Sequence, residues 1–336
     1  MQPPSHADNS ISYLHAEDVV RLRSQLDPLF AELGKAMVGQ QHVLNRLVIG
    51  LLVGGHVLLE GVPGLAKTLA ARSLASCLQL DFHRIQFTPD LLPADIVGTQ
   101  IYNPRSGEFT VKKGPIFADI VLADEINRAP AKVQSALLEA MQEGQVTIGE
   151  TTHVLPKPFL VLATQNPLEH EGTYPLAEAQ TDRFLMKVKL DYPNAEEEKA
   201  ILQRQAKVAS HTSIHAVIGK EVLSQLSSAI DRIYLDSKIE TYVIQIVHAT
   251  RRPTEFGIPI AQYIQNGASP RGTIALALAA KAFALLEGKH FVTPHHVKSI
   301  ALDVLRHRLM LSYEAEAEEI TADRLLQDIL SHVPVP

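Results

Sequence analysis

Hydrophobic residues follow two different patterns along this chain of 336 residues. Between residues 40 and 190, short apolar runs end in polar clusters, which is typical of strands buried on both faces of a parallel sheet. Helical spacing at 67–78 and 131–143 separates these runs, and this alternation predicts a doubly wound α/β fold. The predicted strands are at 56–60, 120–123 and 159–163, with weaker ones at 84–87 and 184–190.

Two further segments of this first half have the pattern of β-hairpins. One covers residues 98–111 with a turn at 103–107, and the other covers 145–154 with a turn near Gly149 and Glu150. Both lie between elements of the predicted sheet. We therefore expect them as insertions into the α/β fold.

The second half of the chain has mostly helical spacing and few β-branched runs. The hydrophobic pattern changes near Tyr192-Pro193-Asn194. We therefore expect a lead-in and helix over 1–35, an α/β core over 36–192 and an all-helical domain over 193–336. Helices are predicted in the second half near 195–207, 219–230, 239–249, 270–286, 294–310 and 321–330.

The composition limits which classes of partner and which cellular compartment we expect for this protein. The 31 basic and 37 acidic residues give a formal charge of -6, so a nucleic-acid partner is not expected. The most apolar stretches, 47–55 and 274–286, are shorter than the ~20 residues that span a bilayer, and we expect no membrane insertion. The first ten residues lack the basic and apolar regions of a secretory signal, and Cys77 has no second cysteine to pair with. We expect a cytoplasmic protein.

A phosphate-binding loop is predicted between the strand 56–60 and the helix 67–78. Backbone N–H groups and the positive helix end would face the β-phosphate, Lys67 would reach the β- and γ-phosphates, and the Thr68 hydroxyl would ligate Mg²⁺. Ala66 departs from the general pattern G-x-x-x-x-G-K-[ST], which has glycine there. The candidate residues are Gly61, Val62, Pro63, Gly64, Leu65, Ala66, Lys67, Thr68 and Leu69.

Two predicted strands end in polar side chains that would complete such a site. Asp124 and Glu125 end one strand, at the sheet edge where α/β folds bind ligands. Asp124 would hold the Mg²⁺ shell and Glu125 would polarise the attacking water, whereas without the loop they would indicate an acidic turn before a helix. Asn166 could hydrogen-bond both the water and the γ-phosphate, with an Asn-Pro turn as the alternative.

Two arginines are candidates for phosphate contacts. Arg183 lies where a helical stretch at 175–182 gives way to a strand, and a cation is favourable near a helix C-terminus in any case. Arg271 lies in the first turn of a helix that Ser269-Pro270 would open, where a cation opposes the helix dipole. An anionic partner would resolve this conflict, and either a bound phosphate or a neighbouring carboxylate would serve.

Together these elements resemble the AAA+ ATPases and, within them, the MoxR family closely. MoxR-like proteins often carry alanine before the lysine of the loop, as Ala66 does here, whereas Thr181 stands where relatives commonly have leucine. The similar regions, in the order Walker A, Walker B, sensor 1, arginine finger and sensor 2, are GVPGLAKT at 61–68, LADEINRAP at 122–130, ATQNP at 163–167, EAQTDRF at 178–184 and GASPR at 267–271.

The resemblance implies further roles. Val38, Gly39 and Gln40 would lie beside the adenine of ATP or ADP, Arg271 would contact the γ-phosphate from a helical lid, and Arg183 would reach into the neighbouring subunit's site. An arginine acting in trans requires an oligomer, and the resemblance implies a homo-oligomeric ring, commonly a hexamer.

By the same resemblance, residues 36–192 would be the nucleotide-binding core and 193–336 the lid. The expected function is ATP-driven remodelling, activation or assembly of a client protein complex, in some relatives with a partner that carries a von Willebrand factor A domain. A nucleic-acid motor and a nucleotide-gated binding module with little turnover are the alternatives.

Overall fold

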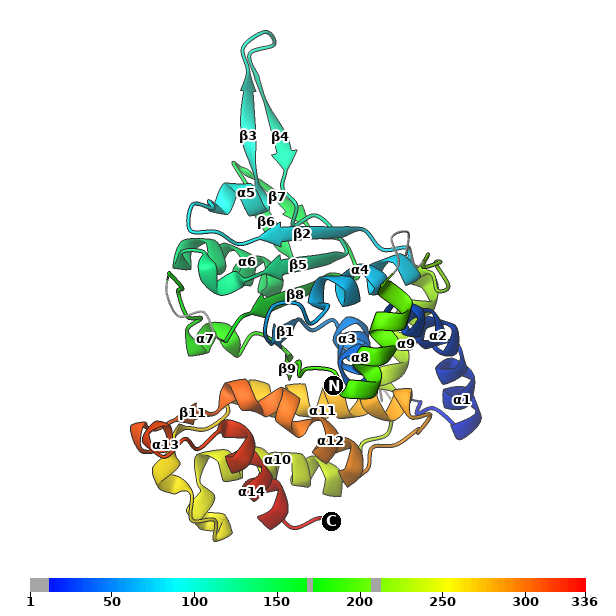
Figure 1. Cartoon of the computed structure of the whole chain (residues 1–336), viewed down its shortest axis with the longest axis vertical. Helices are drawn as coiled ribbons and strands as arrows, with labels where there is room; N and C mark the ends of the chain where they lie inside the picture. Colours follow the sequence, from blue (N-terminus) through cyan, green and yellow to red (C-terminus); the bar gives the residue numbers. More distant parts are fainter. Residues whose placement is uncertain (1–11, 168–171, 207–212) are drawn as a thin grey trace, which may run out of the picture.

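A five-stranded sheet lies at the centre of the protein (Figure 1). The computed structural model describes residues 12–167, 172–206 and 213–336. Within them the strand order is β2-β5-β8-β1-β9, and all neighbouring pairs are parallel. The doubly wound parallel sheet predicted from the sequence is therefore confirmed. Its strands are β1 (Val57–Glu60), β2 (Phe82–Gln86), β5 (Ile120–Asp124), β8 (Leu160–Gln165) and β9 (Met186–Lys189).

Each central strand is buried on both faces, which explains its continuous apolar run. Leu59, Leu122 and Leu162 belong to one hydrophobic cluster, whereas Val121 and Val161 belong to a second cluster on the other face. The first cluster includes helices of the N-terminal segment and the second includes α6. The helices that contribute buried residues to these two clusters include α1 (Ala16–Ser24), α2 (Asp27–Ala36), α3 (Gln41–Val53), α4 (Lys67–Cys77) and α6 (Ala131–Glu143).

The N-terminal segment differs from the prediction in detail. Two helices, α1 and α2, occupy the described part of 1–35, where one was expected, and the whole of α3 was not predicted. Nearly every turn of α3 is buried, so the segment lacks the alternation of apolar and polar positions that reveals a surface helix.

Both predicted hairpins are confirmed. In Figure 1 the first hairpin extends well beyond the sheet. Its two strands carry exposed apolar side chains, among them Tyr102 and Phe109, whose ring centroids lie 5.2 Å apart. The short α5 (Pro93–Val97) precedes it. The hairpin strands are β3 (Gly98–Asn103) with β4 (Glu108–Lys113), and β6 (Gln145–Ile148) with β7 (Thr151–Val154).

Helices dominate the described chain after β9. The expected helix over 294–310 was wrong beyond Leu305, because the buried Arg308 bonds to carbonyl oxygens of the core and Met310 pairs with Asn266. The elements in chain order are α10 (Ser237–Arg251), η2 (Pro253–Phe256), η3 (Ala261–Tyr263), β10 (Ile264–Asn266), α11 (Pro270–Leu286), α12 (Pro294–Leu305), η4 (Arg306–Arg308), β11 (Met310–Leu311), α13 (Tyr313–Ala317) and α14 (Ala322–His332).

Two helices, α8 (Ala195–Gln205) and α9 (Lys220–Asp231), connect the sheet to this helical region. Residue 207, the last of the predicted helix 195–207, lies outside the described residues. The chain before α9 and the first residue of α9 contact the core, since the Val217 N–H donates to the Cys77 carbonyl at 2.8 Å and Lys220 Nζ lies 2.8 Å from Asp119 Oδ1. The domain division at 192 and 193 stays a prediction. No helix in the described parts of the chain has the length and apolar character needed to cross a bilayer.

The buried His56 links β1, β8 and α6 by hydrogen bonds. His56 Nδ1 accepts the Val161 N–H at 3.0 Å, so Nε2 carries the proton and donates to the Met141 carbonyl at 3.1 Å. These bonds link the start of β1 to β8 and to the end of α6. Burial lowers the pKa of His56 from 6.5 to about 4.

We expect His56 to make the protein less stable as the pH falls from 7 to 5. In this window an unfolded histidine takes up a proton that folded His56, with its pKa of about 4, does not bind. The free energy of unfolding should fall by about 2 kcal/mol from this residue alone. Urea unfolding at both pH values should show that the His56→Gln variant loses about 2 kcal/mol less than the wild type. Equal losses in the two proteins would contradict this.

Candidate functional site

The predicted phosphate-binding loop turns tightly between β1 and α4. Ala66 has φ 57° and ψ 23°, the left-handed conformation for which the general pattern carries glycine. A side chain there costs roughly 1–2 kcal/mol, so the loop keeps the glycine geometry under strain. Lys67, the first residue of α4, donates from Nζ to the Gly61 carbonyl at 2.6 Å and closes the loop on itself. A Cβ on Gly61 would lie 2.9 Å from the Leu190 carbonyl oxygen, so glycine is required.

This loop forms one side of a cavity of about 560 Å³. Most of the residues predicted for nucleotide and metal binding line it, whereas Gly39, Gly61 and Val62 lie beside the lining residues in the chain. The predicted residues in the lining are Val38, Gln40, Pro63, Gly64, Leu65, Ala66, Lys67, Thr68, Leu69, Asp124, Glu125 and Asn166. Those that the sequence analysis missed are Ala36, Met37, Arg84, Pro193 and Ile201.

One end of the cavity is mainly apolar. Val38 and Met37 come from the turn before α3, while Pro193 and Ile201 come from the segment that begins α8. These two segments approach closely, because a Cβ on Gly39 would lie 2.2 Å from Glu197 Oε1. An apolar slot with polar groups at its other end suits a flat base attached to phosphates.

At the polar end, Asp124 and Glu125 are held by a residue of the next strand. Thr164 Oγ1 donates to Asp124 Oδ1 at 2.6 Å and accepts the Glu125 N–H at 2.8 Å. Glu125 itself has φ 57° and ψ 51°, a strained conformation of the kind that accumulates at functional sites. Thr164 thus fixes both acids. No sequence pattern pointed to Thr164, since a threonine within a buried strand is ordinary.

Two residues of the edge strand β2, Arg84 and Gln86, also contact these acids, and the sequence analysis missed both. Arg84 donates from Nε and Nη2 to Asp124 Oδ2 at 3.0 and 2.6 Å. Gln86 Nε2 donates to Glu125 Oε2 at 2.7 Å, and Arg128 Nη1 donates to the same oxygen at 3.0 Å. The only sequence signal was the polar alternation of this weak strand.

The donor set fits a magnesium ion. The Thr68 hydroxyl and the Asp124 carboxylate line the same cavity, and oxygen is the ligand type that Mg²⁺ prefers. Among the residues that the structure describes, no group of three His, Cys, Asp or Glu side chains could hold a metal by itself. Burial lowers the pKa of Lys67, while Asp124 and Glu125 oppose this shift.

The two predicted arginines lie elsewhere, in a second cavity of about 320 Å³. Arg183 Nη1 donates to the Leu138 carbonyl at 3.0 Å, and Arg271 Nη1 lies 4.0 Å from Asp182 Oδ2. Neither arginine lines the nucleotide-type cavity. The Asp182 carboxylate is one of the two anions that the sequence left open for Arg271.

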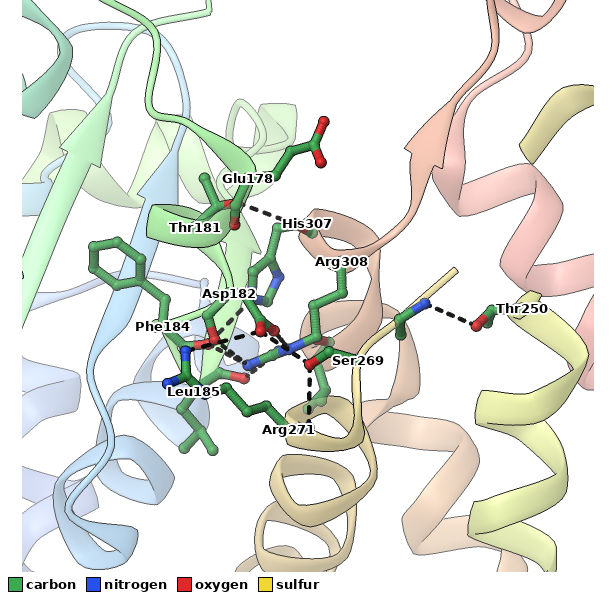
Figure 2. A network of polar contacts seen from close by, with 12 residues as sticks. Glu178, Thr181, Asp182, Phe184, Leu185, Thr250, Ser269, Arg271, His307 and Arg308 are labelled. Atoms are coloured by element: carbon green, nitrogen blue, oxygen red, sulfur yellow. Dashed lines mark hydrogen bonds and ion pairs between the residues drawn. The ribbon is translucent and has the colours of Figure 1, made fainter. Parts of the chain in front are cut away.

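Asp182 connects the Arg183 turn to the helical region, as Figure 2 shows. Its Oδ1 accepts from Arg308 Nε at 2.8 Å, and its Oδ2 accepts from Ser269 Oγ at 2.9 Å. Arg308 also donates to the carbonyls of Asp182 and Phe184 at 3.1 and 2.6 Å. The turn after α7 (Glu178–Thr181) is therefore fixed to the N-terminus of α11 and to η4.

Replacing Asp182 by Asn should destabilise the protein by about 3 kcal/mol, because the buried Arg308 would lose its counter-charge. Urea unfolding at pH 7 measures this loss. Ser269→Ala serves as the control without a change of charge, since it removes the hydrogen bond to the same carboxylate and the helix-cap bond to the Arg271 N–H, and should cost about 2 kcal/mol. An Asp182→Asn loss no greater than that of Ser269→Ala would contradict the role of the charge.

Comparisons with known proteins agree with this geometry. The family model of the ATPases associated with various cellular activities (AAA) matches residues 56–186, and that of the AAA lid domain matches 260–329. The chain is 44% identical over 335 residues to the chaperone MoxR1 of Mycobacterium tuberculosis, covering 99% of this chain and 86% of that protein. It is 31% identical to the protein MoxR of Paracoccus denitrificans, covering 91% and 95% of the two chains.

The chain belongs to the MoxR family of AAA+ ATPases. A crystal structure of a Cytophaga hutchinsonii protein assigned as an ATPase superposes on this MoxR-family chain with a TM-score of 0.89 at 50% identity, covering 95% of this chain and 97% of the other. The chain is therefore an ATP hydrolase with a P-loop AAA+ domain and an AAA lid.

Proposed function

We propose that this MoxR-family ATPase hydrolyses ATP at sites that two copies of the chain complete, in a homo-oligomeric ring such as a hexamer. The separation of the two cavities carries the proposal. Lys67, Asp124 and Glu125 line one cavity, whereas Arg183 and Arg271 line another. Within one chain these arginines do not line the cavity that would hold the phosphates, so a neighbouring chain would supply them.

Within one chain, the apolar end of the first cavity would take the adenine beside Val38 and Gln40. The backbone N–H groups of the loop and Lys67 would bind the phosphates. Bound Mg²⁺, held by Thr68, Asp124 and phosphate oxygens, would neutralise charge on the transferring phosphate.

The remaining polar groups would act on the attacking water. Glu125 would orient it and take its proton, and Asn166 would hydrogen-bond it from the end of β8. Thr164 would keep Asp124 and Glu125 in place by the two hydrogen bonds described above.

The second cavity has the charge needed to meet a neighbour's phosphates. Its lining contains the guanidinium groups of Arg183, Arg271 and Arg308 and one carboxylate, that of Asp182. The depressed pKa of buried His56 keeps that ring neutral near pH 7. The lining is therefore positive, as an arginine finger requires for charge that develops in the transition state. Arg271, expected to contact the γ-phosphate from the lid, would act beside Arg183 on the neighbour's phosphates.

The energy of the cycle would remodel, activate or assemble a client protein complex. The extended β3–β4 hairpin supports a protein client, because it carries exposed aromatic side chains on a projecting arm. A partner with a von Willebrand factor A domain is proposed from the family resemblance. Association of a protein client with the Glu125→Gln chain in ATP would support this function. Stimulation by DNA that falls steeply with salt would favour a nucleic-acid motor instead.

Dependence of turnover on chain concentration tests the shared site. ATP turnover per chain should rise with concentration and reach a plateau when oligomers form, and mass photometry with ATP should show a discrete oligomer at the plateau. Turnover per chain that stays constant on dilution to a monomer would refute the proposal.

A further inference from the structure

Arg84 makes the most direct contact to the acid at the proposed magnesium site. Its Nε and Nη2 both donate to Asp124 Oδ2, at 3.0 and 2.6 Å. The other oxygen, Oδ1, accepts the Thr164 hydroxyl at 2.6 Å. Both oxygens of the Asp124 carboxylate are thus engaged by hydrogen-bond donors of this chain.

The position of Arg84 differs from that of an ordinary structural arginine. Its side chain is 49% exposed, whereas that of Asp124 is 13% exposed, and Arg84 lines the same cavity as Thr68. The guanidinium therefore stands on the solvent side of the carboxylate, toward the space that a nucleotide would fill. A cation entering from this cavity meets Arg84 at Oδ2.

Arg84 also has a second acceptor within reach. Its Nη2 donates to Gln86 Oε1 at 2.8 Å, two residues along the same strand. If Asp124 Oδ2 is taken by another ligand, Arg84 keeps a hydrogen bond on β2 and can turn into solvent. Gln86 on the same strand therefore provides an alternative hydrogen-bond acceptor for Arg84.

We propose that Arg84 is a built-in counter-cation that neutralises Asp124 in the nucleotide-free chain and yields Oδ2 to the hydrated Mg²⁺ that enters with the nucleotide. This rests on the proposed magnesium site at Asp124. Two cations at one carboxylate oxygen repel each other, so Arg84 and Mg²⁺ compete for Oδ2. Arg84 is a positioning residue, since its effect on the metal passes through Asp124.

Competition makes a definite prediction for nucleotide binding. We take the ratio of the dissociation constants of a fluorescent ADP in EDTA and in saturating Mg²⁺ as the magnesium coupling ratio. A half-exposed ion pair of this kind weakens the binding of Mg²⁺ at Asp124 by about fivefold. Arg84→Gln removes the pair and should therefore raise the coupling ratio about fivefold. Arg84→Lys keeps a cation at the position and is the matched control, expected within about twofold of the wild type.

Thermal unfolding supplies a readout that a merely structural role would not give. Without ligand, Arg84→Gln should melt about 2 °C below the wild type, because the ion pair is lost. With saturating Mg²⁺ and ADP the difference should disappear, because the wild type has then released the pair as well. An equal difference in both conditions would show a structural contact and overturn the proposal.

The outcomes also separate this proposal from the function on which it rests. If the wild type binds ADP equally well with and without Mg²⁺, and Asp124→Asn changes nothing, the magnesium site itself is refuted. If the wild type depends on Mg²⁺ but Arg84→Gln leaves the coupling ratio unchanged or lowers it, only the role of Arg84 is refuted.

Discussion

The Glu125→Gln variant should turn over ATP at least about 100-fold more slowly than the wild type while binding it with similar affinity. An amide cannot take a proton from water, and a positioned general base contributes roughly 10²–10⁴-fold. The loop and Lys67, which would bind the phosphates, remain unchanged. Steady-state phosphate release and binding of a fluorescent ATP measure the two quantities.

A matched control for this variant lies on the β6–β7 turn. Glu150 is exposed and does not line the nucleotide-type cavity, so Glu150→Gln should leave turnover unchanged. Turnover by Glu125→Gln within threefold of the wild type would remove Glu125 from the proposed chemistry.

Replacing Arg183 by Ala should lower turnover by about 10³-fold, the lower end of what arginine fingers contribute in phosphoryl transfer. Nucleotide binding by the same chain should not change, because Arg183 does not line its own nucleotide-type cavity. Turnover assays and titration with fluorescent ADP test both statements. Arg105→Ala, on the exposed turn of the β3–β4 hairpin, is the control.

Mixing two inactive chains tests whether Arg183 acts on a neighbour. An interface regains function when an Arg183→Ala chain supplies the loop and a Lys67→Ala chain supplies the arginine. In equal mixtures about one interface in four has this composition, so part of the wild-type turnover should return. Mixed oligomers that show no recovery would exclude Arg183 from a shared site.

The central strands were predictable because burial on both faces leaves an uninterrupted apolar run, which the sequence displays directly. Their polar ends were predictable for the same reason, since Asp124 and Asn166 interrupt the runs at one edge of the sheet. The helix α3 was not predicted because it is buried on most sides, so its sequence lacks the alternation of apolar and polar positions that marks a surface helix. The extension of α12 to residue 310 failed because bonds from Arg308 to distant carbonyls overrode local helical spacing.

Partners brought together only by tertiary structure could not be predicted. Arg84 reaches Asp124 because β2 pairs with β5 in the register that sets Gln86 beside Asp124. Thr164 likewise needs β8 beside β5. Arg183 and Arg271 are far apart in the chain, so their common cavity depends on how the helical region packs on the core.

The place of Asp182 next to Arg183 has a consequence for any ring built from this chain. The same short turn carries the attachment of the helical region and the group proposed to serve the next subunit. A tilt of that region would therefore act directly on the turn that bears Arg183. Because head-to-tail interfaces repeat with one polarity around a closed ring, each subunit would influence the neighbour on one side only, and successive cleavage events would acquire a sense of rotation.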